Sequence, residues 1–187
     1  MLIVGIGGTL RQGSGSEVAL RIALDEAARC GAATRCFSGP DLNMPFYDPS
    51  TPARTSAAQQ LVETLRQADG IILCSPGYHG LVSGLIKNAL DYVEDMVMDR
   101  RAYFDGLPIG CIGLGFGHQG AHAAMSALRS VAHALRGWPT PYGCTVQVER
   151  GLFGNGVCSD AGIESRLRIV GRQVAEFANA RPLARTG

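Results

Sequence analysis

The stretch that decides the fold is residues 5–16, GIGGTLRQGSGS, which stands between an apolar run at 2–4 and a helical pattern from Val18 to Ala28. This order predicts a buried strand, a turn of small residues and a helix. Glycines let the backbone approach a ligand closely, and the free N–H groups at the positive end of the helix point into the same space. With three hydroxyl groups and one cation, the loop predicts a phosphate site formed by Thr9, Arg11, Ser14, Gly15 and Ser16.

Other interpretations of this loop depend on single residues. An ATP-type P-loop needs Lys and then Ser or Thr after its second glycine, but Ser14 and Gly15 follow Gly13. The dinucleotide fingerprint needs a third glycine where Leu10 stands. A plain strand-to-helix turn capped by Ser16 stays open. The hydroxyl groups and the single Arg favour a terminal phosphate monoester, whose oxygens accept several hydrogen bonds.

Length, composition and charge limit the class of protein. The 187 residues suit one domain, 1–187, with a full core, and 46% hydrophobic and 18% charged residues are ordinary for a globular chain. A net charge of +1 gives no reason to expect nucleic acid or an anionic membrane surface as a partner. We see no secretory signal before the first strand and no apolar run near the roughly 20 residues of a membrane span. We therefore expect a cytoplasmic protein.

The six cysteines do not suggest a metal or disulfide framework. Cys74, Cys111 and Cys144 lie in predicted strands and are interpreted as small core residues. The absence of a Cys-x-x-Cys pair argues against a zinc ribbon or a thioredoxin-type dithiol. A disulfide framework is not expected in a chain of this size and compartment.

Five apolar runs alternate with five helical patterns, without internal repeats or a linker. The runs occupy 2–4, 33–37, 70–74, 109–114 and 144–148, and the helical spacings occupy 18–28, 58–65, 86–93, 124–135 and 167–177. This alternation predicts an α/β doubly wound domain with a five-stranded parallel sheet. Ligands bind such sheets beyond the carboxyl ends of the strands, where glycine-rich loops follow the first, third and fourth strands. The polar tail 181–187 is expected to fray.

The loop after the third strand contains Pro76, Gly77, Tyr78, His79 and Gly80. Its backbone groups could face a flat heterocycle. Tyr78 and His79 either line such a ligand or are ordinary loop residues that face solvent, and for the isolated loop the second interpretation is favoured.

The loop after the fourth strand, 115–120, is a formal Gly-x-Gly-x-x-Gly. The acidic residue that should follow about 20 positions later to hold a ribose is missing, so we interpret the glycines as a permissive wall of the ligand site. His118 and His122 have the spacing of half a metal site, but no nearby Cys, Asp or Glu completes it. No metal is predicted. A hydrolase triad is not predicted either, because the chain has no Gly-x-Ser-x-Gly elbow.

Two long motifs, in this order, resemble those of the NAD(P)H-dependent FMN reductases. Residues 8–16, GTLRQGSGS, are similar to the family's phosphate loop, GSxRxxSxN. Residues 75–80, SPGYHG, and 83–91, SGLIKNALD, are similar to its TPEYNG and PGxLKNALD, and 41–48 resembles its proline-containing loop. The likeness covers residues 2 to about 135. Gly77 and His79 stand where the family usually has Glu and Asn.

The resemblance implies a flavodoxin-like three-layer α/β/α sandwich that binds FMN. The phosphate loop would hold the phosphate, residues 76–80 would meet the ring, and Gly115, Gly117 and His118 would form another wall. NADPH or NADH would donate hydride, and free flavin, a quinone, an azo compound or another small acceptor would receive the electrons. No catalytic protein residue is required, because the cofactor carries the chemistry. Relatives often complete the flavin site with a second subunit, which implies a homodimer or homotetramer, with 92–98 as a candidate contact.

Two functions from other classes stay open on the sequence. One is a flavodoxin-like electron carrier that does not itself oxidise NAD(P)H; such carriers are usually strongly acidic, whereas this chain has 17 basic and 16 acidic residues. The other is a phosphate-sensing or nucleotide-binding module without redox chemistry. Steady-state oxidation of NADPH or NADH would separate the enzyme from both.

Overall fold

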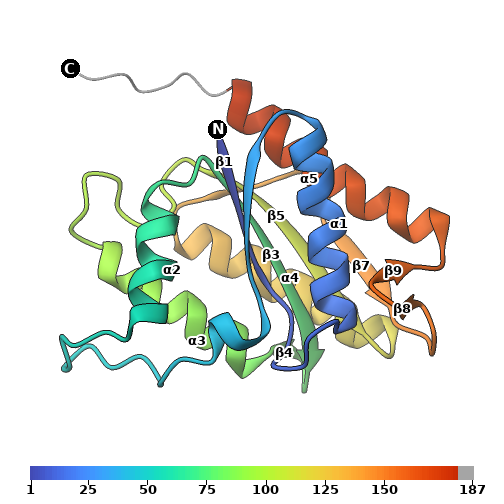
Figure 1. Cartoon of the computed structure of the whole chain (residues 1–187), viewed down its shortest axis with the longest axis horizontal. Coiled ribbons are helices and arrows are strands. Elements are labelled where there is room, and N and C mark those ends of the chain that lie inside the picture. The colour runs from blue at the N-terminus through green and yellow to red at the C-terminus, as the bar shows by residue number, and fades with distance from the viewer. Residues whose placement is uncertain (181–187) are drawn as a thin grey trace.

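The computed structural model describes residues 1–180 and contains a central sheet covered by helices on both faces (Figure 1). The main strands, all parallel, are β1 (Leu2–Gly7), β2 (Ala33–Phe37), β3 (Gly70–Tyr78), β5 (Pro108–Gly115) and β7 (Cys144–Gln147). They lie in the order β2-β1-β3-β5, and β7 pairs with the second half of β5. The predicted five-stranded parallel sheet is thus confirmed, while the tail 181–187, expected to fray, lies outside the described residues.

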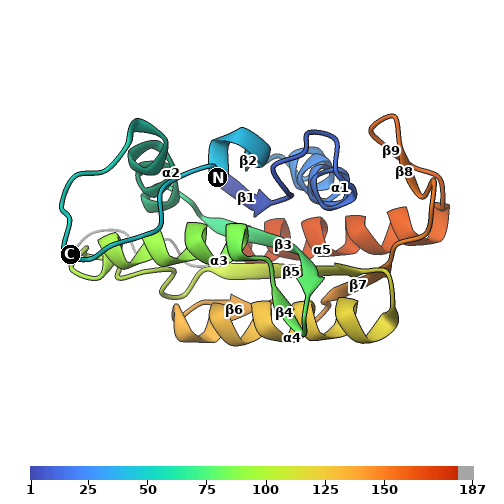
Figure 2. The ribbon, with the colours of Figure 1, turned by 90° about the horizontal axis from the view of Figure 1, so that it is seen from below.

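The helices form the outer two layers, as Figure 2 shows for α4 and α5 on opposite sides of the sheet. One core cluster contains residues of α1 (Gly15–Arg29) and α5 (Ala161–Ala180), and the other contains residues of α2 (Ser56–Arg66), α3 (Gly84–Asp91) and α4 (His118–Ala134). Because side chains alternate along a strand, Ile3 joins the first cluster and the adjacent Val4 joins the second. The apolar runs therefore supply both faces of the sheet.

Three helix boundaries differ from those expected from periodicity. Helix α1 begins at Gly15, three residues before the expected start, and its cap is Ser14 instead of Ser16. Helix α4 begins at His118, inside the glycine-rich segment. Helix α3 ends at Asp91, and the chain continues as a 3-10 helix, η2 (Tyr92–Met96). Caps and glycines thus set the helix ends, which the apolar spacing alone does not locate.

Several short elements were not expected from the sequence. A 3-10 helix, η1 (Gly39–Leu42), follows β2. Strand β4 (Leu81–Val82) pairs antiparallel with the end of β3, and β6 (Trp138–Pro139) pairs with the start of β5. Strands β8 (Phe153–Gly154) and β9 (Val157–Cys158) form a separate hairpin. Two-residue strands are too short for any alternation of polar and apolar residues to be visible.

The strand cysteines are core residues, as predicted. Cys74, Cys111 and Cys144 are buried, and all six cysteines are free thiols. Burial raises the pKa of Cys111 to about 12 and that of Cys144 to about 11. Since the thiolate is the reactive form, both are inert packing residues. Within residues 1–180, no helix is long and apolar enough to cross a membrane.

Candidate functional site

The predicted phosphate loop is a tight turn between β1 and α1. Gly8 and Gly13 have φ values of 102° and 66°, which L side chains adopt rarely. The hydroxyl of Thr9 accepts a hydrogen bond from Arg11 N (3.2 Å), and the hydroxyl of Ser14 accepts one from Glu17 N (3.4 Å). Thr9 therefore shapes the turn, and Ser14 caps the helix.

The first N–H groups of α1 remain open toward this turn. The first intrahelical bond runs from Val18 N to Ser14 O at 2.9 Å, so the N–H groups of Gly15 and Ser16 precede the helical ladder. They lie at the positive end of the helix dipole. The hydroxyl groups of Ser14 and Ser16 lie 3.4 Å apart and are both buried. This arrangement can bind an anion.

The charged side chains of the loop have different environments. Glu17, only 6% exposed, accepts a bond from Gly13 N (3.0 Å) and bonds from Arg21 Nε and Nη2 (3.0 and 2.9 Å). Arg11 is exposed, and no side chain or carbonyl in the described part of the chain bonds to its guanidinium. Sequence reasoning missed Glu17 and Arg21, although their i, i+4 spacing is a signal of a helical ion pair.

The expected loop after β3 is a hairpin. Its turn residues, His79 and Gly80, have φ values of 52° and 88°, the positive pair that a type I′ turn requires. Asn and His are both among the side chains enriched at positive φ, so His79 keeps the backbone conformation that Asn favours. Tyr78 is 51% exposed and His79 is exposed. At the base of the hairpin, Ser83 N donates to Ser75 Oγ at 3.0 Å.

The third loop joins β5 to α4 and carries Gly115, Gly117 and His118. Gly117 is the N-cap of α4 and supplies no side-chain cap, and His118 is the first helical residue. A Cβ built on Gly115 would lie 2.6 Å from Ala121 N, so glycine is needed for the helix to begin this close to the strand. Phe116 is 88% exposed.

The three loops lie at one edge of the sheet because β1, β3 and β5 are parallel neighbours (Figure 1). The thiol of Cys74, in the middle of β3, donates to Ser16 O at 3.2 Å, which fixes the start of α1 relative to β3. The η1 segment, which the sequence did not reveal, also borders the phosphate loop: a Cβ on Gly39 would lie 3.7 Å from Thr9 O. The structure thus brings all three predicted groups of site residues to the same edge, with η1 as an additional neighbour.

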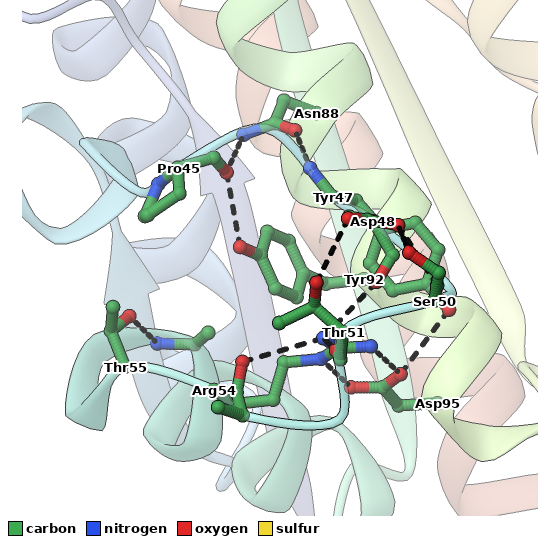
Figure 3. Close-up of polar contacts among 12 residues, drawn as sticks. Pro45, Tyr47, Asp48, Ser50, Thr51, Arg54, Thr55, Asn88, Tyr92 and Asp95 are labelled. Carbon is green, nitrogen blue, oxygen red and sulfur yellow. Dashed lines mark hydrogen bonds and ion pairs between the residues drawn. The ribbon is translucent and has the colours of Figure 1, made fainter.

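A long segment after η1, residues 43–55, is bound to α3 and η2 by hydrogen bonds and an ion pair (Figure 3). Asn88 donates from Nδ2 to Pro45 O (2.9 Å) and accepts at Oδ1 from Tyr47 N (2.9 Å). Arg54 donates from Nε and Nη2 to the two carboxylate oxygens of Asp95 at 2.7 and 2.9 Å. These contacts give a segment without helix or strand a defined path against α3 and η2.

No metal centre is formed by the described residues. Within 1–180, no group of three or more His, Cys, Asp or Glu side chains is arranged to hold an ion. His118 and His122 are both exposed on the first turns of α4. The site therefore consists of backbone groups, hydroxyls, one open Arg and exposed aromatic and imidazole side chains.

The fold is that of the flavodoxin-like α/β proteins. The flavoenzyme NAD(P)H:(acceptor) oxidoreductase from Paracoccus denitrificans superposes with a TM-score of 0.76 at 17% identity, covering 96% of this chain and 97% of that chain. A WrbA-like flavodoxin from Agrobacterium tumefaciens has a TM-score of 0.66 at 14% identity, covering 96% and 99%. At these identities the likeness shows the shared fold. The expected three-layer sandwich is confirmed.

Sequence similarity then identifies the family. Residues 1–149 match the model of the NADPH-dependent FMN reductases. The FMN-dependent NADPH-azoreductase of Staphylococcus aureus is 31% identical over 147 residues, which cover 75% of this chain and 74% of that protein. The chain belongs to the NADPH-dependent FMN reductase family, as its motifs predicted. It is an FMN-dependent oxidoreductase that takes electrons from NAD(P)H.

Proposed function

We propose that FMN lies along the edge formed by the three loops, with its phosphate in the β1–α1 turn. Arg11, the hydroxyl groups of Thr9, Ser14 and Ser16, and the N–H groups of Gly15 and Ser16 hold the phosphate. The observation that carries this assignment is the exposed Arg11 in the turn that leads into the N-terminus of α1, where the N–H groups of Gly15 and Ser16 precede the helical ladder. Glu17 does not oppose the ligand's charge strongly, because Arg21 balances it through two hydrogen bonds.

The other two loops form the walls around the flavin ring in this proposal. The wall on the β3–β4 hairpin consists of Pro76, Gly77, Tyr78, His79 and Gly80, and the wall on the β5–α4 loop consists of Gly115, Gly117 and His118. Bound FMN supplies the redox chemistry, namely hydride uptake from NAD(P)H and electron transfer to the acceptor. The protein binds and orients the ring, and no side chain needs to act as an acid or base.

The proposed acceptor is a small molecule: free flavin, a quinone, an azo compound or another small acceptor. An azo compound has specific support, because the 31% identical relative from Staphylococcus aureus is an azoreductase. Family membership argues against the alternative of an electron carrier that does not oxidise NAD(P)H. We further propose that residues 1–187 act as one FMN-binding domain in the cytoplasm. We propose no nucleic-acid or membrane partner, since the chain is nearly neutral.

A homodimer or homotetramer is also proposed, but the candidate contact at 92–98 becomes smaller. Tyr92, Val93 and Met96 are at most 3% exposed and belong to the core of their own subunit. Val97 and Met98 are 39% and 90% exposed, so they are the hydrophobic residues of the segment that a second copy could contact.

The test of the phosphate assignment compares FMN with riboflavin, which lacks the phosphate. We expect tighter binding of FMN to the wild type and a selective loss in Arg11→Ala. A hydrogen bond to a charged group is worth roughly 1.5–3 kcal/mol, and the exposure of Arg11 favours the low end. FMN affinity should therefore fall by about tenfold to a hundredfold, while riboflavin affinity stays constant.

The matched control is Arg100→Ala. Arg100 is also exposed, but it lies in the segment before β5, at the opposite edge of the sheet. Fluorescence titrations of both ligands, at one salt concentration, should show no change in this variant. Equal losses of FMN and riboflavin in Arg11→Ala would mean that Arg11 supports the shape of the loop, and no loss of either would remove the phosphate assignment.

A further inference from the structure

The β3–β4 hairpin and the first turn of α4 are in backbone contact. A Cβ built on Gly77 would lie 2.3 Å from Gly120 O and 2.8 Å from Gly120 C. Real Cβ atoms do not approach other atoms this closely, and the obstructing group is a main-chain carbonyl that cannot rotate away. The hairpin and the helix can therefore touch at this point only because residue 77 has no side chain.

The approach of α4 is equally close on β5, the neighbouring strand. A Cβ on Gly113 would lie 2.3 Å from Ala121 O, and one on Gly115 would lie 2.6 Å from Ala121 N. Figure 2 shows β4 beside α4, and the two elements pack against each other. Helix α4 thus lies directly on the ends of both strands, and Gly77 joins the hairpin to it.

The hairpin itself has a fixed shape. Gly77 pairs with Val82, Tyr78 pairs with Leu81, and the base is closed by the bond from Ser83 N to Ser75 Oγ. Ser75 is fully buried. A rigid hairpin that contacts the helix at Gly77 transmits any displacement at that contact to Tyr78 and His79, the next two residues.

We propose that Gly77 is a positioning residue that fixes the separation of the two walls of the flavin-ring site. This inference rests on the proposed function, in which residues 76–80 and 115–118 border the ring. The family's usual Glu at this position is incompatible with the contact to Gly120, so the two walls are closer here than that side chain would allow. We therefore expect the ring site to be already formed before the cofactor binds.

The first test is Gly77→Ala. One methyl group must push the hairpin and α4 apart by about 1 Å to reach ordinary contact distance, and a misplacement of this size can reduce a rate by about a hundredfold. At full FMN loading, we expect flavin reduction by saturating NADPH, followed by stopped-flow absorbance, to be about tenfold to a hundredfold slower. The ratio of FMN to riboflavin affinity should not change, because the phosphate loop is untouched.

The matched control is Gly84→Ala, at the start of α3 just after the hairpin. A Cβ there meets nothing within 4 Å, so its reduction rate should equal that of the wild type. A wild-type rate in Gly77→Ala would overturn the inference. Failure of the proposed function is distinguishable, because it would appear as equal FMN and riboflavin affinities in the wild type itself.

Amide hydrogen exchange of the wild type tests whether the hairpin wall is formed without FMN, even if Gly77→Ala does not fold. In the protein without FMN, the amides of Tyr78 to Ser83 that form the hairpin bonds should exchange about a hundredfold more slowly than in an unstructured chain. Protection that is already present without FMN supports a preformed wall. Exchange at the unstructured rate that slows only after FMN is added would contradict it.

Discussion

The Arg54–Asp95 ion pair gives a sharp prediction about the segment 43–55 (Figure 3). The guanidinium makes two hydrogen bonds to the carboxylate, and Tyr47 Oη donates a third at 3.3 Å. The side chains of Arg54 and Asp95 are only 14% and 22% exposed. Arg54 also lies over the rings of Tyr47 and Tyr92, 4.8 and 5.6 Å from their centroids. We expect Asp95→Asn to destabilise the fold measurably.

The magnitude follows from these contacts. Removing one partner of a fully buried ion pair costs about 3–5 kcal/mol, whereas exposed pairs contribute about 0–1 kcal/mol. Asn keeps one carbonyl acceptor, and water reaches part of the pair, so we expect a loss of about 2 kcal/mol in the free energy of unfolding at pH 7. For a chain of this size, that loss lowers Tm by about 4–8 °C.

The pH dependence has a definite sign. The hydrogen bonds from Arg54 hold the pKa of Asp95 below its ordinary value. A carboxyl group with a lowered pKa in the folded state stabilises the protein fully above its unfolded pKa, about 3.9, and this contribution is lost as the pH falls through the folded value. The stability difference between wild type and Asp95→Asn should therefore be constant from pH 7 to 5 and shrink below about pH 4.

Urea unfolding at pH 7, 5 and 3.5 measures this difference, and Asp91→Asn is the matched control. Asp91 pairs with Lys87 at i, i+4, but these side chains are 42% and 53% exposed, so its replacement should change stability by less than about 0.5 kcal/mol. An Asp95→Asn loss no larger than that of the control at pH 7 would refute the reasoning. A difference that grows in acid would refute the assigned sign.

Two further predictions concern packing and assembly. Gly171→Ala should lower the free energy of unfolding, measured in urea, by about 3 kcal/mol or more, because its Cβ would lie 1.9 Å from Ala23 O between α1 and α5. The control is Gly162→Ala, whose Cβ would have a side-chain oxygen at 3.2 Å as its nearest atom and which should not show this loss. Light scattering at micromolar concentration should show a dimer or tetramer. If the exposed Met98 lies in the subunit contact, Met98→Asp should shift the measured mass toward that of the monomer. A wild-type monomer would contradict the proposed assembly.

Much of the fold could be predicted because its signals are local. The apolar run at 70–74 identified β3, and the spacing of Leu61, Val62 and Leu65 identified α2. The continuation of β3 to Tyr78 was missed because Pro76, Gly77 and Gly80 are typical of loops. The hairpin depends on positive φ values at His79 and Gly80, and Gly80 is the stronger signal of this conformation in the sequence.

The path of the segment 43–55 could not be predicted from local sequence patterns. Arg54 and Asp95 are 41 positions apart, as are Tyr47 and Asn88. No periodicity connects such residues, since their pairing depends on how η1 and α3 are placed by the sheet. A single sequence can propose that this segment is a loop, but the path it takes depends on tertiary contacts.

The phosphate loop illustrates the difference between naming site residues and assigning their roles. In the sequence, the hydroxyls of Thr9, Ser14 and Ser16 are equivalent candidates. In the structure, the Thr9 hydroxyl is bonded to the backbone of Arg11, and Ser14 caps α1, so both also shape the turn. The pairing of the charges is equally invisible in the sequence. Because Glu17 is bonded to Gly13 N and Arg21, Arg11 is the loop's uncompensated charge, and discrimination between FMN and riboflavin should depend on Arg11 more than on any single hydroxyl.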